Sequence, residues 1–376
     1  MAFLAAQFVV AAPPARAIET LAEQALLMDT ATGEVLFEKN ADMPMTPASM
    51  SKMMTVYMVF DRLKDGSLSL DDTFLVSENA WRKGGAKSGG STMFLLPGKR
   101  VRVEDLIRGI IVQSGNDASI VVAEGLARSE EAFAEEMTQR SNELGLENSV
   151  FKNATGWPNP GHVSTARDLA TLALRTIEDF PEYYRYYSEK EFTYNDIRQI
   201  NRNPLLYKDI AVDGLKTGHT LESGYGLAAS ATKGNRRLIL VVNGLRTKRQ
   251  RSREPERLLT WGFREFNNYH LFSAGEEVTK ADVWLGESPK VALVIGKDML
   301  VTLPRKARRG MKVTVTFDSP VPAPIAKGDP VAELVVTVPG REPIRVPLTA
   351  GAEVPRLGLI GRLFTALKAI IWGEAG

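Results

Sequence analysis

Ser49 and Lys52 are the two residues of this sequence that are best suited to covalent chemistry. Lys52 follows Ser49 by three positions, so on a helix the hydroxyl and the amine would lie one turn apart on the same face. A lysine accepts a serine proton only when it is neutral, and from a usual pKa of about 10.4 this requires burial or a neighbouring cation. The pair therefore predicts a serine nucleophile with a lysine base, and it requires a second positive group in the same site.

The surroundings of Ser49 separate it from two other serines that have a lysine three positions later. Ser149 lies in a short polar stretch and Ser230 near a predicted hairpin turn, whereas Ser49 begins a long predicted helix. Apolar residues follow a helical period as far as Gly66, namely Met53, Val56, Tyr57, Phe60 and Leu63. The unpaired N–H groups and the positive dipole at the start of this helix would stabilise an oxyanion beside Ser49.

Two further segments could complete such a site. Ser114 and Asn116, in a predicted turn between helices, supply a hydroxyl that can relay a proton and an amide that can hold a peptide carbonyl. Lys216, Thr217 and Gly218 lie on a predicted strand. There Lys216 would supply the second positive charge, and Gly218 would let a substrate backbone approach closely. Each segment alone is common, but the ordered set of three is far more specific.

Composition excludes several other function classes. The chain has 376 residues, enough for two domains, and its 44% hydrophobic and 24% charged residues are ordinary for a globular protein. A net charge of +2 gives no indication of nucleic-acid binding. The sequence has no cysteine and only three histidines, which excludes disulfides and thiolate nucleophiles and disfavours the usual zinc sites. We therefore expect no metal, no other cofactor and no nucleic-acid partner.

The order of predicted elements indicates an α/β (α+β three-layer) domain over residues 18–272. A predicted strand pair precedes the helix at Ser49, and Asp117 is predicted to cap a later helix. The glycine-rich residues 84–91 are predicted to form a mobile surface loop. The predicted strands are 25–29, 35–38, 212–217, 225–232 and 237–243, and the other predicted helices are 103–112, 117–127, 130–144, 165–177 and 252–266.

Three other segments differ in character from this domain. Residues 273–350 alternate short apolar runs with Gly and Pro clusters, which predicts a small all-β domain. Residues 1–17 contain an apolar run and then Ala15-Arg16-Ala17, which is typical of a secretory signal peptide with a truncated start; a buried N-terminal helix is the alternative. Residues 351–376 predict an amphipathic helix in a membrane interface, and docking on the protein's own core or on a partner subunit is the alternative.

The sequence resembles the type-5 low-molecular-mass penicillin-binding proteins, which are D-alanyl-D-alanine carboxypeptidases of the bacterial envelope. The resemblance extends over essentially the whole chain. It rests on the ordered set Ser49-x-x-Lys52, Ser114-x-Asn116 and Lys216-Thr217-Gly218 and on the longer phrases 47–55, 153–168 and 258–263. It implies a serine β-lactamase/transpeptidase-like catalytic domain, followed by a small all-β domain and a C-terminal amphipathic helix.

The resemblance also implies a role for each site residue. Ser49 would attack the carbonyl of the penultimate D-alanine of a peptidoglycan pentapeptide, and Lys52 would take the serine proton. Ser114 would assist proton transfer, and the substrate contacts would come from Asn116, Lys216, Thr217, Gly218, His219 and Arg251. The backbone N–H groups of Ser49 and His219 would bind the oxyanion. Water would hydrolyse the acyl-enzyme after D-alanine leaves.

The same resemblance implies partners and a location. The partners would be the peptidoglycan pentapeptide as substrate, β-lactam antibiotics as covalent inhibitors and the membrane surface. The protein would lie in the periplasm, attached peripherally to the inner membrane. His162 lies in a segment that the resemblance places near the cleft, but a surface or capping role is equally open. The sequence leaves the oligomeric state open.

Three alternative functions share parts of the pattern. A β-lactamase needs a glutamate that holds a water, and residues 191–195 have a suitable Glu-x-x-x-Asn spacing but lie in an apparent strand, too close before Lys216. A D,D-endopeptidase uses the same residues on cross-links, although such enzymes usually look shorter. A non-catalytic envelope scaffold is disfavoured by the intact Ser49, Lys52 and Lys216.

Overall fold

The computed structural model describes residues 18–363, which form two compact units. Residues 35–261, together with the segment up to Met28, make up the first unit, and residues 29–34 and those from Gly262 onward make up the second. The second unit therefore begins again at Gly262, ten residues before the boundary predicted at residue 272. The reason is that β10 (Phe266–Phe272) pairs with β13 (Met299–Pro304) of the second unit and not with the sheet of the first.

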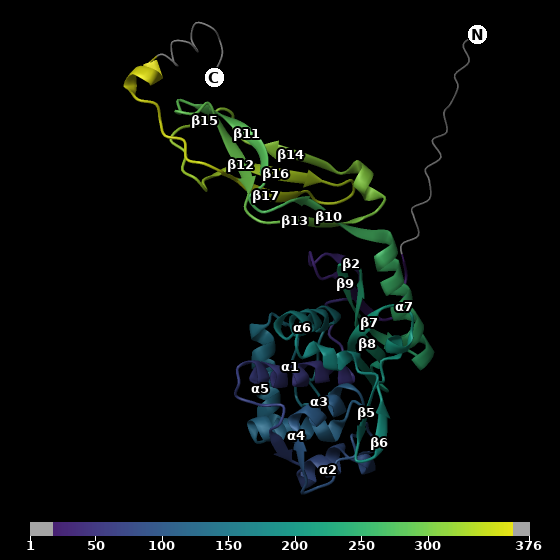
Figure 1. The fold of residues 1–376 in the computed structure, drawn as a ribbon. Coiled ribbons are helices and arrows are strands. Elements are labelled where there is room, and N and C mark those ends of the chain that lie inside the picture. The colour runs from purple at the N-terminus through teal and green to yellow at the C-terminus, as the bar shows by residue number, and fades with distance from the viewer. Residues whose placement is uncertain (1–17, 364–376) are drawn as a thin grey trace, which may run out of the picture. The chain divides into compact units, whose positions relative to one another are not determined.

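A five-stranded sheet forms the middle layer of the first unit. Its strand order is β2-β1-β9-β8-β7, and the central strands β8 and β9 are largely buried. Helix α6 (Ala166–Asp179) packs on β8 and β9, and α7 (Lys248–Glu265) lies on the other side of the sheet (Figure 1). The predicted three-layer α+β fold is thereby confirmed. The strands are β1 (Gln24–Asp29), β2 (Val35–Lys39), β7 (Val212–Thr220), β8 (Gly224–Lys233) and β9 (Arg236–Leu245).

Helix α1 (Lys52–Lys64) runs through the centre of the helical layer. Ten of its residues are buried, which explains why apolar side chains extend beyond a single helical face. The turn that carries Ser49 is a separate 3-10 helix, η1 (Ala48–Ser51), and it contacts β7 and β8. The sequence predicts one continuous helix from Ser49. Around α1 lie α3 (Val103–Ile111), α4 (Asn116–Ala127), α5 (Glu130–Glu143) and α6.

The glycine-rich residues 84–91 are not the open loop that the sequence predicts. They begin at the last residue of α2 (Glu78–Gly84) and continue into η2 (Ala86–Ser88). A Cβ on Gly84 would lie 2.2 Å from the backbone nitrogen of Asp117. Glycine is required there because α2 packs directly against the start of α4.

Asp117 has a different role from the predicted helix cap. Helix α4 begins one residue earlier, at Asn116, with Gly115 in the capping position. The buried carboxylate of Asp117 accepts hydrogen bonds from the Thr92 hydroxyl at 2.7 Å and from the backbone N–H groups of Met93 at 2.8 Å and Leu95 at 3.1 Å. Asp117 therefore fixes residues 92–95 against α4.

Short elements complete the first unit beside these layers. The hairpin of β5 (Glu191–Tyr194) and β6 (Ile197–Ile200) lies between two 3-10 helices. Those helices are η3 (Tyr184–Ser188) and η4 (Pro204–Tyr207), and a second small strand pair consists of β3 (Thr73–Leu75) and β4 (Arg100–Arg102).

The second unit is built from β-strands, as its sequence predicts. A six-stranded sheet has the order β14-β16-β17-β12-β11-β15, and buried Leu293, Leu334 and Leu348 lie in its core. Its strands are β11 (Glu277–Trp284), β12 (Lys290–Ile295), β14 (Lys312–Thr316), β15 (Val321–Pro322), β16 (Pro330–Thr337) and β17 (Ile344–Ala350), and η5 (Ala307–Gly310) precedes β14.

The predicted terminal segments lie largely outside the described residues. The predicted signal peptide, residues 1–17, falls there entirely, as does the second half of the predicted C-terminal segment, residues 364–376. Residues 359–363 are helical, and the side chains of Leu359, Ile360 and Leu363 are exposed. Between residues 18 and 363, no helix has the length and apolar character needed to cross a membrane.

We expect Asp117→Asn to lower the free energy of unfolding by about 2 to 3 kcal/mol, because a buried amide cannot accept every bond that the carboxylate accepts. Urea denaturation followed by circular dichroism measures the change. Thr92→Val removes a single donor and should cost only about 1 kcal/mol. Equal losses for the two variants would contradict this account of Asp117.

Candidate active site

The amine of Lys52 lies at the centre of the site and is fully buried. Its Nζ contacts three oxygens: Ser49 Oγ at 3.1 Å, Asn116 Oδ1 at 2.7 Å and the backbone carbonyl of Thr155. These three acceptors match the three donors of a protonated lysine, so a charged Lys52 is fully satisfied there. After losing one proton, the same amine is in position to accept the hydrogen of Ser49.

Burial is the main reason that the pKa of Lys52 falls to about 7. The positive charge of Arg202 lowers this pKa further, while the negative charges of Glu130 and Asp117 raise it. The sequence assigns the second positive group to Lys216, and the two lysines do interact, because the charge of Lys52 lowers the pKa of Lys216. Arg202 is a further cation that acts on Lys52. Arg202 follows β6, donates to the Ser91 hydroxyl and belongs to no recognisable motif, so sequence reasoning missed it.

Ser114 carries two signs of a specialised position. Its φ is +64°, a left-handed conformation that is uncommon for a serine and that clusters at functional sites. Its Oγ is buried, and within the described part of the chain it has no hydrogen-bond partner. Asn116, two residues later in the same turn, contacts Lys52 directly.

Lys216 is buried on β7 close to several other positive groups. Burial lowers its pKa well below the usual range, and the charges of Lys52, Arg202 and Arg251 lower it further. In the described part of the chain, none of Lys216, Arg202 and Arg251 forms an ion pair with a carboxylate. The Nε of Arg251 is buried and has no hydrogen-bond partner there. A buried lysine with further cations around it is unfavourable until an anion binds.

Gly218 packs closely against the turn that carries Ser49. A Cβ at this position would lie 2.8 Å from the carbonyl oxygen of Pro47 and 3.3 Å from the Cβ of Ala48. Glycine therefore lets β7 pack closely on the turn that carries Ser49. That Gly218 also lets a substrate backbone approach closely stays a prediction.

Arg251, His219 and Thr217 lie around the same end of β7. The ring of His219 lies 4.0 Å from that of Tyr225, and the guanidinium of Arg251 lies 5.2 Å above Tyr225. Arg251 also donates to the carbonyl oxygen of Gly218 at 3.4 Å. Thr217 is buried, whereas the His219 side chain is exposed.

His162 is buried, so a surface position is excluded. It is only 1% exposed, and its ring lies beside Ser51, two residues after Ser49. Burial lowers its pKa to about 4, and the positive charges of Lys52 and Lys152 contribute. His162 is therefore neutral at physiological pH.

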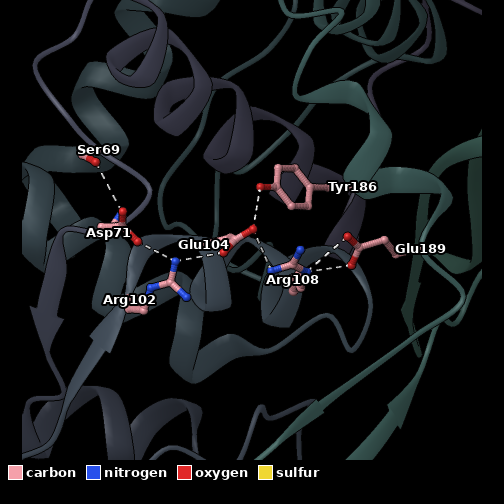
Figure 2. Close-up of polar contacts among 7 residues, drawn as sticks. All are labelled: Ser69, Asp71, Arg102, Glu104, Arg108, Tyr186 and Glu189. Atoms are coloured by element: carbon pink, nitrogen blue, oxygen red, sulfur yellow. Dashed lines mark hydrogen bonds and ion pairs between the residues drawn. The ribbon is translucent and has the colours of Figure 1, made fainter.

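An ion-pair network joins α3 to the segment that precedes the β5–β6 hairpin. Arg108 pairs with Glu104 at 3.0 Å and with Glu189 at 2.9 Å, and the hydroxyl of Tyr186 donates to Glu104 (Figure 2). The other pairs in the network join Arg102 to Asp71 and Glu104. The side-chain amide of Asn201 donates to the carbonyl oxygen of Glu189. The network thus ties α3 to the base of the β5–β6 hairpin, and Arg202 is the next residue.

The contact between Ser49 and Lys52 and the lowered pKa of Lys52 identify a class of enzyme. A serine hydroxyl bonded to a buried lysine amine of lowered pKa is the arrangement of serine acyl-transfer enzymes that use lysine in place of histidine as the base. A family model described as D-alanyl-D-alanine carboxypeptidase matches residues 8–247, and one described as penicillin-binding protein 5, C-terminal domain, matches residues 266–356. The chain belongs to the D-alanyl-D-alanine carboxypeptidase family, of the penicillin-binding protein type.

Individual relatives agree with this assignment. D-alanyl-D-alanine carboxypeptidase DacA of Escherichia coli is 40% identical over 350 residues, which cover 92% of this chain and 87% of that protein. Penicillin binding protein 5 from Haemophilus influenzae is 38% identical with a TM-score of 0.80, over 92% of this chain and all of that one. Penicillin-binding protein D2 from Listeria monocytogenes, solved in an ampicillin-bound form, is 29% identical with a TM-score of 0.57, over 66% of this chain and all of that one. The family resemblance drawn from the motifs is confirmed.

Replacing Arg202 should raise the pKa of Lys52 above about 7, because the nearby cation disfavours the protonated amine. In Arg202→Gln, the pH midpoint of the Lys52 Cε chemical shift, measured by NMR on 13C-lysine-labelled protein, should therefore move to higher pH.

Arg198→Gln provides a control on the same hairpin, because Arg198 is exposed and paired with Glu191. It should leave the midpoint of Lys52 unchanged. An unchanged midpoint in Arg202→Gln as well would show that the charge of Arg202 does not act on Lys52.

Proposed function

We propose that this chain removes the terminal D-alanine from peptidoglycan stem pentapeptides through an acyl-enzyme on Ser49. One observation carries the proposal: the hydrogen-bonded Ser49–Lys52 pair lies in a site where Lys216, Arg202 and Arg251 have no carboxylate partner in the described chain. A peptide that ends in a free carboxylate supplies both the carbonyl for the serine and the anion for these cations. The family assignment supports the same chemistry.

The first half of the reaction forms an ester on Ser49. Neutral Lys52 takes the Ser49 proton while Oγ attacks the carbonyl carbon of the penultimate D-alanine. The oxyanion is held by the backbone N–H groups of Ser49 and His219. When the C–N bond breaks, the proton passes from Lys52, with help from the Ser114 hydroxyl, to the leaving D-alanine amine.

The second half of the reaction restores the serine. Lys52, neutral again, takes a proton from a water that attacks the ester carbonyl, and the shortened peptide leaves as Ser49 recovers its hydrogen. A β-lactam presents a carbonyl and a carboxylate in the same relation, so it forms a covalent adduct by the first half alone. The ampicillin-bound form of the Listeria relative supports this part of the proposal.

The substrate carboxylate is assigned to the end of β7. Lys216 and Arg251 supply positive charge, and Thr217 supplies a hydroxyl. Asn116 orients the peptide through its amide, and Gly218 contributes backbone. Binding of the carboxylate favours the protonated form of Lys216, whose pKa burial otherwise keeps low.

The β-lactamase alternative needs a glutamate that holds a water, and strand β5 does not supply one. Glu191 lies on that strand, is exposed and pairs with Arg198, so it is not placed to hold a water for deacylation. The endopeptidase alternative differs only in the leaving group, and it is distinguished by the substrate that is cleaved.

Ser49→Ala should form no covalent adduct with a labelled penicillin and release no D-alanine from a soluble pentapeptide, because it lacks the nucleophile. Mass spectrometry of the tryptic peptide and a D-alanine assay measure the two outcomes. Ser149→Ala, which removes the serine of another Ser-x-x-Lys sequence, should retain both activities. An adduct that persists in Ser49→Ala would overturn the mechanism, and cleavage of cross-linked dimers alone would favour the endopeptidase.

The proposal extends to the two ends of the chain. We assign residues 1–17 to a signal peptide, residues 18 onward to a periplasmic protein and the C-terminal helix, which begins at residue 359 and not at the predicted residue 351, to the surface of the inner membrane. The exposed Leu359, Ile360 and Leu363 on the described helical turn support the last assignment.

Truncation after Gly358 should move the protein from the membrane fraction to the soluble fraction of producing cells, because it removes the whole apolar face. The truncated protein keeps residues 354–357, whose backbone is hydrogen-bonded to Leu285, Glu287 and Ile325 of the second unit. Activity on a soluble pentapeptide should be unchanged. A truncated protein that remains in the membrane fraction would refute the anchor.

A further inference from the structure

His162 is buried beside the nucleophile, yet no step of the proposed mechanism uses it. Both of its ring nitrogens have partners. Nδ1 accepts from the backbone N–H of Lys152 at 3.2 Å, and Nε2 lies 2.8 Å from the hydroxyl of Ser51. Because Nδ1 acts as an acceptor, the single proton of the neutral ring is on Nε2, which donates to Ser51.

Ser51 passes this hydrogen bond on toward the nucleophile. Its Oγ accepts from His162 and donates to the carbonyl oxygen of Ala48 at 2.9 Å. Ser51 is completely buried, so water cannot replace either bond. The three hydrogen bonds from Lys152 through His162 and Ser51 to Ala48 all run in one direction, which strengthens each of them.

This chain of hydrogen bonds, which we call the relay, ends at Ala48, the residue directly before Ser49. Ala48 has a φ of +50°, a left-handed conformation that is unfavourable for any residue with a Cβ and persists only where the surroundings hold it. Its carbonyl oxygen also lies against Gly156, where a Cβ would come within 1.9 Å. The relay and this close packing together hold the Ala48 carbonyl.

The carbonyl of Ala48 and the N–H of Ser49 belong to one planar peptide unit and point in opposite directions. Whatever fixes the direction of the carbonyl therefore also fixes the direction of the N–H. In the proposed function, on which this inference rests, that N–H is one of the two oxyanion donors.

We propose that His162 is a positioning residue that acts through Ser51 and Ala48 to aim the Ser49 N–H at the oxyanion. Its ring must be neutral, because a protonated ring cannot accept the N–H of Lys152. Burial and the nearby lysine charges keep its pKa at about 4, so the relay is intact throughout the range in which Lys52 loses its proton.

A double-mutant cycle on acylation by a fluorescent penicillin tests the relay. His162→Ala and Ser51→Ala should each lower the acylation rate at saturating penicillin about 10- to 100-fold, which is less than complete loss of an oxyanion donor. The concentration for half-maximal rate should change little. The double variant should be no slower than either single variant, because all three break the same relay.

Two conservative variants and one control sharpen the test. His162→Gln offers an acceptor and a donor on one side chain and should recover part of the rate, and Ser51→Cys keeps the volume with a weaker donor and should also be slowed. Ser164→Ala removes a buried hydrogen bond to Ser149 in the same segment but has no link to Ala48. It should lower the melting temperature without slowing acylation.

Two results would overturn the relay. The first is a lowered melting temperature with an unchanged acylation rate in His162→Ala and in both Ser51 variants. The second is a pair of rate losses that multiply in the double variant. Absence of a Ser49 adduct in the wild-type protein would instead refute the proposed function.

Discussion

Burial of the Lys52 amine is the constraint on which the site depends. A buried ammonium group is costly unless each donor has a partner, and here the partners come from η1, α4 and the segment at residue 155. Three segments distant in sequence must therefore meet at one nitrogen atom. The same burial brings the pKa of Lys52 to about 7, so the packing that closes the site also gives the amine its capacity as a base.

The neighbouring cations show that part of the site is unfavourable without substrate. Lys216 is buried, and the charges of Lys52, Arg202 and Arg251 lower its pKa. A cluster of this kind opposes folding through repulsion and desolvation, and the rest of the unit must compensate through the apolar core around α1. A bound carboxylate reverses the sign of this electrostatic interaction, which links binding to a gain in stability.

The sequence predicted the layers of the first unit and the residues of the motifs because both leave local patterns. Ser49 and Lys52 do meet as their spacing indicated, and Asn116 joins them as the motif set indicated. Arg202 was missed and His162 was left open because the charge of Arg202 acts on Lys52, and His162 contacts Ser51, only in the folded chain. The packing of Gly218 on Ala48 was not predicted for the same reason, since the two residues are remote in sequence. The second unit begins earlier than predicted because β10 pairs with β13, and the sequence of β10 alone does not indicate this pairing.

A single segment, residues 153–162, supports both the nucleophile and the base. Asn153 accepts from the N–H groups of Thr155 and Gly156 through one oxygen, at 3.2 and 2.7 Å, which shapes the turn. That turn presents the Thr155 carbonyl to Lys52, and the same segment reaches the Ser49 turn through Gly156 and His162. Because the base and the serine share this support, their distance is set by one local structure. A substitution in this segment therefore acts on both groups at once, even though the segment supplies no atom to the reaction.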